Sequence, residues 1–122
     1  MTLGKAIGDY DLKMTSVDHA EDGSGVTVNL EGPATGFGTV LGTCIFRGGA
    51  PEKMGSCSWR SQAFLDDGEQ KQGFGEGTWD EVGKHQWRVR LLIRISDGQI
   101  IASDGTLDLG SRTMKGKVLE WS

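Results

Sequence analysis

Hydrophobic and polar positions alternate with a period of two along most of the chain, and no longer stretch keeps a helical period. The alternating segments are separated by short runs rich in Gly, Asp and Ser, which are typical of tight turns. No linker or repeat divides the chain, so residues 1–122 are expected to form a single domain. The pattern predicts eight β-strands, at about 9–18, 25–32, 36–46, 55–65, 71–80, 85–95, 100–109 and 112–121.

Eight short strands joined by tight turns form either a sandwich or a barrel. Gly accounts for 20 of the 122 residues, whereas Pro occurs only twice. Because glycine-rich strands such as residues 73–77 tolerate sharp bending and coiling, the composition favours the barrel. The expected fold is therefore all-β, a single eight-stranded antiparallel meander β-barrel.

Strand register is predicted by the pairing that gives each hairpin one apolar face and one polar face. This criterion places Trp79 opposite Trp87, and Cys44 opposite Cys57. A three-residue turn over residues 96–98, followed by a two-residue turn at residues 110–111, gives the last three strands a common inward face. The residues predicted on that face include Ile101, Ser103, Gly105, Leu107, Met114, Val118 and Glu120.

The predicted inward face gathers aromatic and thiol side chains near one end of the barrel. An aromatic-lined pocket with a histidine at its rim suits an apolar or aromatic small molecule, so the leading function is small-molecule binding. A filled core is the alternative, because eight strands enclose a space that side chains alone can occupy. The candidate ligand-binding residues are Trp59, Trp79, Trp87, Cys44, Cys57 and Ser103, with His85 at the rim.

A second hypothesis is a cofactor-free isomerase, cyclase or lyase. A carboxyl enclosed without a charge partner can serve as a general acid or base, and Glu120 is predicted to face inward beside Ile101. The alternative is that Glu120, among the last residues of the chain, lies in water. His85 offers an imidazole, which exchanges protons near neutral pH. Tyr10 would orient the substrate, although the register of the first two strands, and hence the direction of this side chain, is left open by the pattern. Whether the protein is an enzyme at all is also left open.

Net charge and cysteine content limit the range of partners. The chain carries 13 basic and 17 acidic residues, a net charge of −4, which disfavours nucleic acid as a partner. No apolar run is long enough to span a bilayer, so no membrane partner is expected. Residues 1–8 lack signal-peptide features, which predicts a cytoplasmic location and two reduced thiols.

Neither a metal nor a cofactor is expected. The two histidines, His19 and His85, lie too far apart in the sequence for a zinc signature with the two cysteines. The glycine-rich segments 36–38 and 73–77 are not followed by a helix start, so they do not predict phosphate-binding loops.

Three large apolar residues, Ile100, Leu119 and Trp121, are predicted on the outward face of neighbouring strands. Such a group is typical of a covered surface, so a homo-oligomer is expected. This observation gives a third hypothesis, an oligomeric interaction protein with a filled core.

The segments GFGEGTW (73–79), HQW (85–87) and GKVLEW (116–121), with short Asp-Gly turns, resemble small bacterial barrels of the allene-oxide-cyclase-like and lipocalin-like (calycin-type) group. The resemblance covers about residues 25–122 and rests on spacing. It implies a barrel that binds a lipophilic small molecule, and in some members a cofactor-free cyclisation or isomerisation. No catalytic residue of that group matches a position in this chain.

Overall fold

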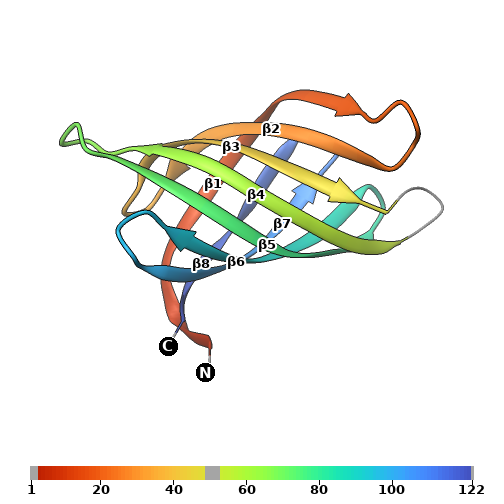
Figure 1. The fold of residues 1–122 in the computed structure, drawn as a ribbon. Helices are drawn as coiled ribbons and strands as arrows, with labels where there is room; N and C mark the ends of the chain where they lie inside the picture. The colour runs from red at the N-terminus through yellow and green to blue at the C-terminus, as the bar shows by residue number, and fades with distance from the viewer. Residues whose placement is uncertain (1–2, 49–52, 122) are drawn as a thin grey trace.

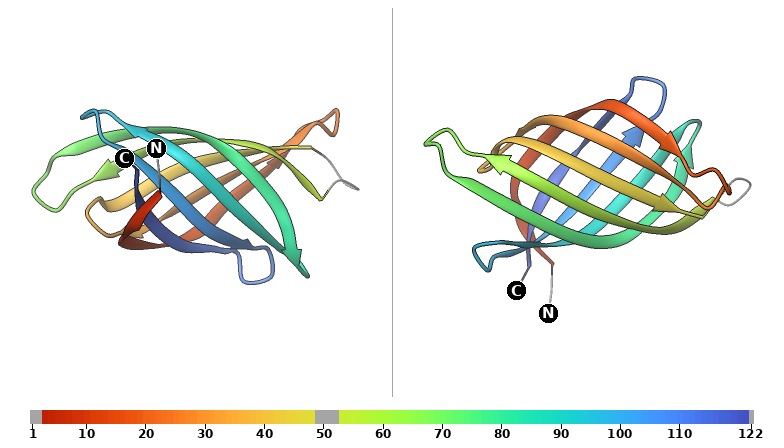
Figure 2. Two further views of the ribbon diagram at one scale, coloured as in Figure 1. Left: turned by 90° about the horizontal axis from the view of Figure 1, so that it is seen from below. Right: turned by 45° about the horizontal axis from the view of Figure 1, so that its top comes forward.

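The computed structural model describes residues 3–48 and 53–121, and most of them lie in strands. Each strand pairs antiparallel with its neighbours in sequence, and β8 returns to β1 to close the barrel (Figures 1 and 2). The predicted eight-stranded antiparallel meander barrel is confirmed. The strands are β1 (Leu3–His19), β2 (Gly25–Ala34), β3 (Gly38–Arg47), β4 (Met54–Phe64), β5 (Gln70–Gly83), β6 (Gln86–Ile95), β7 (Ile100–Asp108) and β8 (Thr113–Trp121).

The connections between strands define two ends of the barrel. The β2–β3, β4–β5 and β6–β7 turns lie at one end, on the left in Figure 1. The start of β1 and the end of β8 belong to the same end and lie at the bottom of that view. We call this the proximal end. The β1–β2, β5–β6 and β7–β8 turns mark the opposite, distal end.

Strand β1 closes the barrel and is longer than predicted. It begins at Leu3 instead of residue 9, and it pairs with β8 along its first part and with β2 along its second. Register shifts on either side of Ala6 interrupt the alternation of residues 3–8, which hid this part of the strand from the sequence pattern. The register left open at the first hairpin is thereby settled, and Tyr10 faces inward with 9% of its surface exposed.

The last hairpin has the predicted register, in which Ile101 opposes Glu120 and Ser103 opposes Val118. The β6–β7 turn is also as expected, with Gly98 at a positive φ of 97° and a hydrogen bond from the Ile95 N–H to the Gln99 carbonyl. These two turns are short, and short turns fix the register of the strands they join.

Two other predicted registers are wrong by two residues. Cys44 opposes Trp59 instead of Cys57, and Trp79 opposes Val89 instead of Trp87. A shift of two residues keeps every side chain on its predicted face, so the inward and outward assignments hold.

Each error has a cause in the connecting segment. Strand β5 runs on to Gly83 through a register shift after Glu81, so the β5–β6 turn is tighter and later than the pattern suggests. The β3–β4 connection is long and includes residues 49–52, which lie outside the described residues, and a long connection does not set register.

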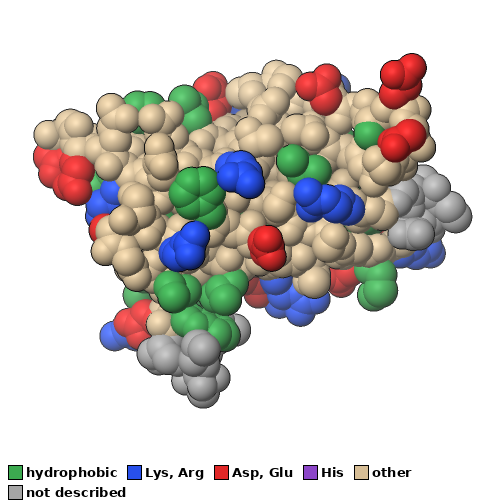
Figure 3. Space-filling view, viewed as in Figure 1, with side chains coloured by type: hydrophobic (Ala, Val, Ile, Leu, Met, Phe, Trp, Pro, Cys, Tyr) green, Lys and Arg blue, Asp and Glu red, His purple; other side chains and the backbone are tan. Residues whose placement is uncertain are grey.

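The outer surface carries an apolar row that crosses several strands. Leu92, Ala102 and Leu119 are successive partners on β6, β7 and β8. Ile100 lies beside them with 42% of its surface exposed, while Leu119 and Trp121 are half-buried. Figure 3 shows hydrophobic side chains gathered on the surface near the chain termini. The outward placement is as predicted, and assembly into a homo-oligomer stays a prediction.

Among residues 3–48 and 53–121 there is no helix with the length and apolar character needed to cross a membrane.

Candidate binding site inside the barrel

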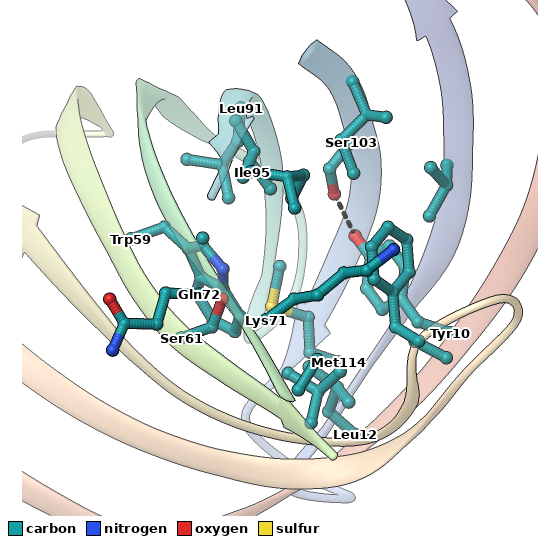
Figure 4. Close-up of a pocket in the computed structure, with 18 residues that line it drawn as sticks. Tyr10, Leu12, Trp59, Ser61, Lys71, Gln72, Leu91, Ile95, Ser103 and Met114 are labelled. Carbon is teal, nitrogen blue, oxygen red and sulfur yellow. Dashed lines mark hydrogen bonds between the residues drawn. The ribbon is translucent and has the colours of Figure 1, made fainter. Parts of the chain in front are cut away.

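The barrel interior contains two separate hollows, one toward each end. The proximal pocket is a cavity of about 70 Å³ between the inward faces of the strands (Figure 4). The distal hollow is wider, about 800 Å³. The single pocket expected from the sequence is therefore divided, and the side chains between the two hollows form a packed core.

Apolar side chains, most of them aliphatic, form the greater part of the wall of the proximal pocket. A glycine-rich stretch of β5 faces the wide aliphatic side chains of β6, so the wall is thin on one side and bulky on the other. An apolar wall of this kind favours the apolar part of a ligand through removal of its surface from water. The aliphatic lining comprises Leu12, Ala34, Val40, Ala63, Leu91, Ile93, Ile95, Ile101 and Val118.

Trp59 contributes the indole that lines this pocket. Its six-membered ring lies directly over Gly42 of β3, where a Cβ would overlap the ring atoms. Only a glycine leaves space for the ring, so the large aromatic side chain on β4 lies over a residue of β3 that has no side chain. The ring consequently lies flat against the barrel wall and leaves the cavity beside it open.

Tyr10 and Ser103 bring two hydroxyl groups into the apolar interior. Ser103 Oγ donates a hydrogen bond to the Tyr10 hydroxyl oxygen over 2.9 Å, and both side chains are buried. Gly105 and Gly116 lie under the phenol as partners on β7 and β8, and a Cβ at either position would overlap the hydroxyl oxygen. This glycine pair makes room for the end of the tyrosine side chain.

Burial raises the pKa of Tyr10 to about 12, against the opposing effect of the Ser103 hydrogen bond. Removal from water disfavours the charged phenolate more than one hydroxyl donor can stabilise it. The phenol is therefore neutral at physiological pH and keeps its own proton available as a hydrogen-bond donor.

Lys71 lies at the mouth of the proximal pocket. Figure 4 shows its side chain extending across the opening, and only 20% of that side chain is exposed. Its Nζ lies 3.1 Å from a carboxylate oxygen of Asp97 in the β6–β7 turn. The Gln99 N–H and the Lys71 ammonium hold the pKa of Asp97 below its usual value. The mouth is therefore bridged by an ion pair between β5 and a neighbouring turn.

Three aromatic side chains stack on one another toward the distal end. The Trp79 and Trp87 rings are 4.7 Å apart between centroids, and Phe46 meets the Trp87 ring edge-on at 5.2 Å. Trp79 Nε1 donates to the carbonyl of Arg47 over 2.8 Å. The three rings pack against one another, and the Trp79 indole N–H already has an acceptor. The cluster therefore stabilises the fold and offers few free hydrogen-bonding groups to a ligand.

His85 occupies the β5–β6 turn at the rim of the distal hollow. It has a positive φ of 60°, its carbonyl accepts the Leu109 N–H, and its side chain is exposed. His85 therefore lines the distal hollow and not the cavity that Trp59 lines.

Cys44 and Cys57 are free thiols buried in the core between the two hollows. Neither lines a hollow, so the structure gives them no contact with either space. The hydrogen bond with Cys57, together with burial, raises the pKa of the Cys44 thiol well above its usual range. Within the described residues, no group of three or more His, Cys, Asp or Glu side chains is placed to hold a metal ion.

Of the two interpretations of Glu120, the structure supports the one in which its carboxylate lies in water. Its pairing with Ile101 is as predicted, but its side chain is exposed and lies over Gly4 of β1. Strand β8 extends past the closed part of the lumen, so the inward face of its last residues is open to water. Position on the inward face of a strand does not ensure burial at the end of a barrel.

The structure thus divides the predicted site residues into groups. Tyr10, Trp59 and Ser103 meet in the proximal pocket, while Trp79, Trp87 and His85 line the distal hollow. Sequence reasoning missed Lys71, although one signal was present. Lys71 lies eight residues before Trp79 in the same strand, and Trp79 is predicted to face inward, so the alternation of the strand carries the lysine inward as well.

Together, the fold and the pocket define a closed eight-stranded meander barrel with a small apolar cavity at one end. Comparisons of this chain with protein-family models, with curated proteins and with solved structures give no match.

Proposed function

We propose that this barrel binds a small, largely apolar molecule in its proximal pocket. The observation that carries the proposal is the cavity of about 70 Å³, walled by aliphatic side chains and supplied with a few convergent polar groups. This combination of apolar surface with a few placed hydrogen-bonding groups is typical of small-molecule sites.

The size of the cavity limits the ligand. Since a water molecule needs roughly 10–15 Å³ of such space, the cavity accepts about five to seven non-hydrogen atoms. The ligand is therefore smaller than the lipids that wide barrels enclose, or only part of a longer molecule enters.

The resemblance to calycin-type barrels agrees with this proposal, because members of that group bind lipophilic molecules inside the barrel. Fold analogy is a weak basis for a ligand assignment, so the pocket itself is the main support. The cofactor-free isomerase, cyclase or lyase needs an acid or base beside the ligand. Of the three candidate catalytic residues, Glu120, His85 and Tyr10, only Tyr10 lines the proximal pocket.

The test uses nuclear magnetic resonance of the indole N–H groups during a titration of the intact protein. The chain has four tryptophans, and Trp59 is the one that lines the proximal pocket. We expect xenon under pressure, and small apolar or aromatic compounds, to shift the Trp59 signal in a saturable way. The Trp79 and Trp87 signals should move much less.

The matched control is Ala63→Leu, which adds apolar volume to the pocket wall. We expect this variant to weaken binding at least about tenfold, because the added side chain occupies the ligand space. If xenon and the compounds leave Trp59 unchanged in the wild-type protein, the proposal is wrong. Saturable shifts confined to Trp79 and Trp87 would contradict it as well, by placing the site in the distal hollow.

A further inference from the structure

We infer that the proximal pocket selects a neutral carbonyl compound, a small ketone or aldehyde whose oxygen accepts a hydrogen bond from Tyr10. This inference rests on the proposed binding function and adds the chemical class of the ligand. It follows from the hydrogen-bonding state of the hydroxyl pair, the charge around the mouth and the size of the cavity.

The hydroxyl pair has a donor without an acceptor. The two hydroxyls share one hydrogen bond, from Ser103 Oγ to the Tyr10 oxygen, and no second hydrogen bond made by the Tyr10 hydroxyl is found among the described residues. A buried donor that lacks a partner carries a free-energy cost, and a ligand oxygen would remove that cost. A carbonyl oxygen accepts and does not donate, so it completes the chain from Ser103 through Tyr10 to the ligand.

The neutral phenol suits an uncharged acceptor. The pKa of Tyr10 is raised to about 12 by burial, so the group stays protonated as a donor. Aliphatic side chains surround the remainder of the cavity, and they offer favourable contact to the carbon atoms of a ketone or aldehyde.

The charges at the proximal end disfavour a carboxylate ligand. The three turns at this end carry the acidic side chains Asp66, Asp67, Glu69 and Asp97 and no basic residue. Lys71, the cation that lines the pocket, is already paired with Asp97 at 3.1 Å. An anion would have to approach a negative rim and compete with Asp97 for the ammonium group.

The experiment compares three ring compounds by the Trp59 titration. Cyclopentanone supplies a carbonyl oxygen, methylenecyclopentane replaces that oxygen with a carbon of similar shape, and cyclopropanecarboxylate supplies a negative charge with the same number of non-hydrogen atoms. We expect cyclopentanone to bind about 3- to 10-fold more tightly than methylenecyclopentane, and the carboxylate to bind most weakly.

The variant Tyr10→Phe removes the donor and keeps the ring. It should weaken the binding of cyclopentanone about 3- to 10-fold and leave the binding of methylenecyclopentane unchanged. A purely structural role of Tyr10 would instead weaken the binding of both compounds equally. The comparison of ligands on the wild-type protein stands even if this variant does not fold.

The outcomes separate the two proposals. Equal or tighter binding of methylenecyclopentane, with no selective effect of Tyr10→Phe, would overturn the carbonyl inference and leave the binding function intact. Tight binding of the carboxylate, lost in Lys71→Met, would overturn it in favour of an anionic ligand. Failure of all three compounds and of xenon to reach Trp59 would overturn the binding function itself.

Discussion

The two ends of the barrel use aromatic residues in opposite ways. At the distal end, Phe46, Trp79 and Trp87 stack on one another, and the Trp79 indole N–H is bound by a backbone carbonyl. At the proximal end, Trp59 and Tyr10 are separated, each lying over glycine positions, and a cavity remains between them.

The difference shows why a concentration of aromatic residues is a poor guide to a binding site. Rings that pack against one another bury their own surface and contribute mainly to the stability of the fold. Rings held apart by glycines leave space, and a polar group beside that space keeps hydrogen-bonding capacity for a ligand. In this barrel the apolar cavity and the Tyr10 hydroxyl occur at the end where the aromatic residues are held apart.

The largest expected effect tests the structural role of the distal aromatic stack. Phe46 is 1% exposed and contacts both indoles, so Phe46→Ala should lower the free energy of unfolding by about 3–5 kcal/mol. Denaturant unfolding measures this loss. Binding of xenon in the proximal pocket should persist in the folded fraction of the variant.

A substitution in the proximal wall supplies the contrast. Val40→Ala enlarges an existing cavity and removes little packing, so it should cost about 1–2 kcal/mol and alter ligand affinity. If Phe46→Ala changed proximal binding as much as Val40→Ala does, the two ends would not be independent.

The sequence pattern predicted the fold class, all eight strands and the inward or outward face of the residues assigned from hairpins. It succeeded where turns are short, as between β6 and β7, because turn length then fixes register. It placed Cys44 opposite the wrong partner because the β3–β4 connection is long. It also missed the start of β1, where register shifts interrupt the alternation.

The candidate site was harder to predict, because facing inward does not specify the position of a side chain along the barrel axis. The residues Trp59, Trp79 and Trp87 share an inward face, yet tilted strands carry them to different hollows. Glu120 faces inward and still lies in water, since it belongs to the open end. Axial position depends on the register of every strand at once, which no single hairpin pattern contains.

The buried phenol predicts a loss of stability at alkaline pH. The unfolded chain releases the Tyr10 proton near pH 10, whereas the folded protein keeps it to about pH 12. Unfolding is therefore favoured as the pH rises through this window, and by pH 12 the contribution lost is about 2–3 kcal/mol. Below pH 10 the contribution is fully present.

Urea unfolding of the wild-type protein and of Tyr10→Phe at several pH values isolates this effect, because the other groups titrate in both proteins. The difference in unfolding free energy between the two should shrink between pH 10 and pH 12. A difference that is independent of pH would show that the phenol is not held neutral in the pocket.

The glycine pair under Tyr10 predicts a smaller loss that depends on the phenol. In Gly105→Ala the new Cβ would overlap the Tyr10 hydroxyl and approach the Lys115 carbonyl, so the expected cost is about 1–3 kcal/mol. Tyr10→Phe in the same chain should recover part of it, giving a non-additive double-mutant cycle. Gly110→Ala in the β7–β8 turn is the control and should cost little. Strict additivity would mean that Gly105 does not serve to accommodate the hydroxyl.

The smallest effect concerns the ion pair at the proximal mouth, which has no counterpart among the stacked rings of the distal end. Asp97 is 40% exposed on its side chain, so Asp97→Asn should leave the unfolding free energy nearly unchanged. The substitution also leaves the Lys71 ammonium without its carboxylate and makes the rim less negative. We therefore expect cyclopropanecarboxylate to bind about 2- to 5-fold more tightly at low salt, with the gain screened at high salt. Unchanged carboxylate binding would show that the Lys71 charge does not control what enters the pocket.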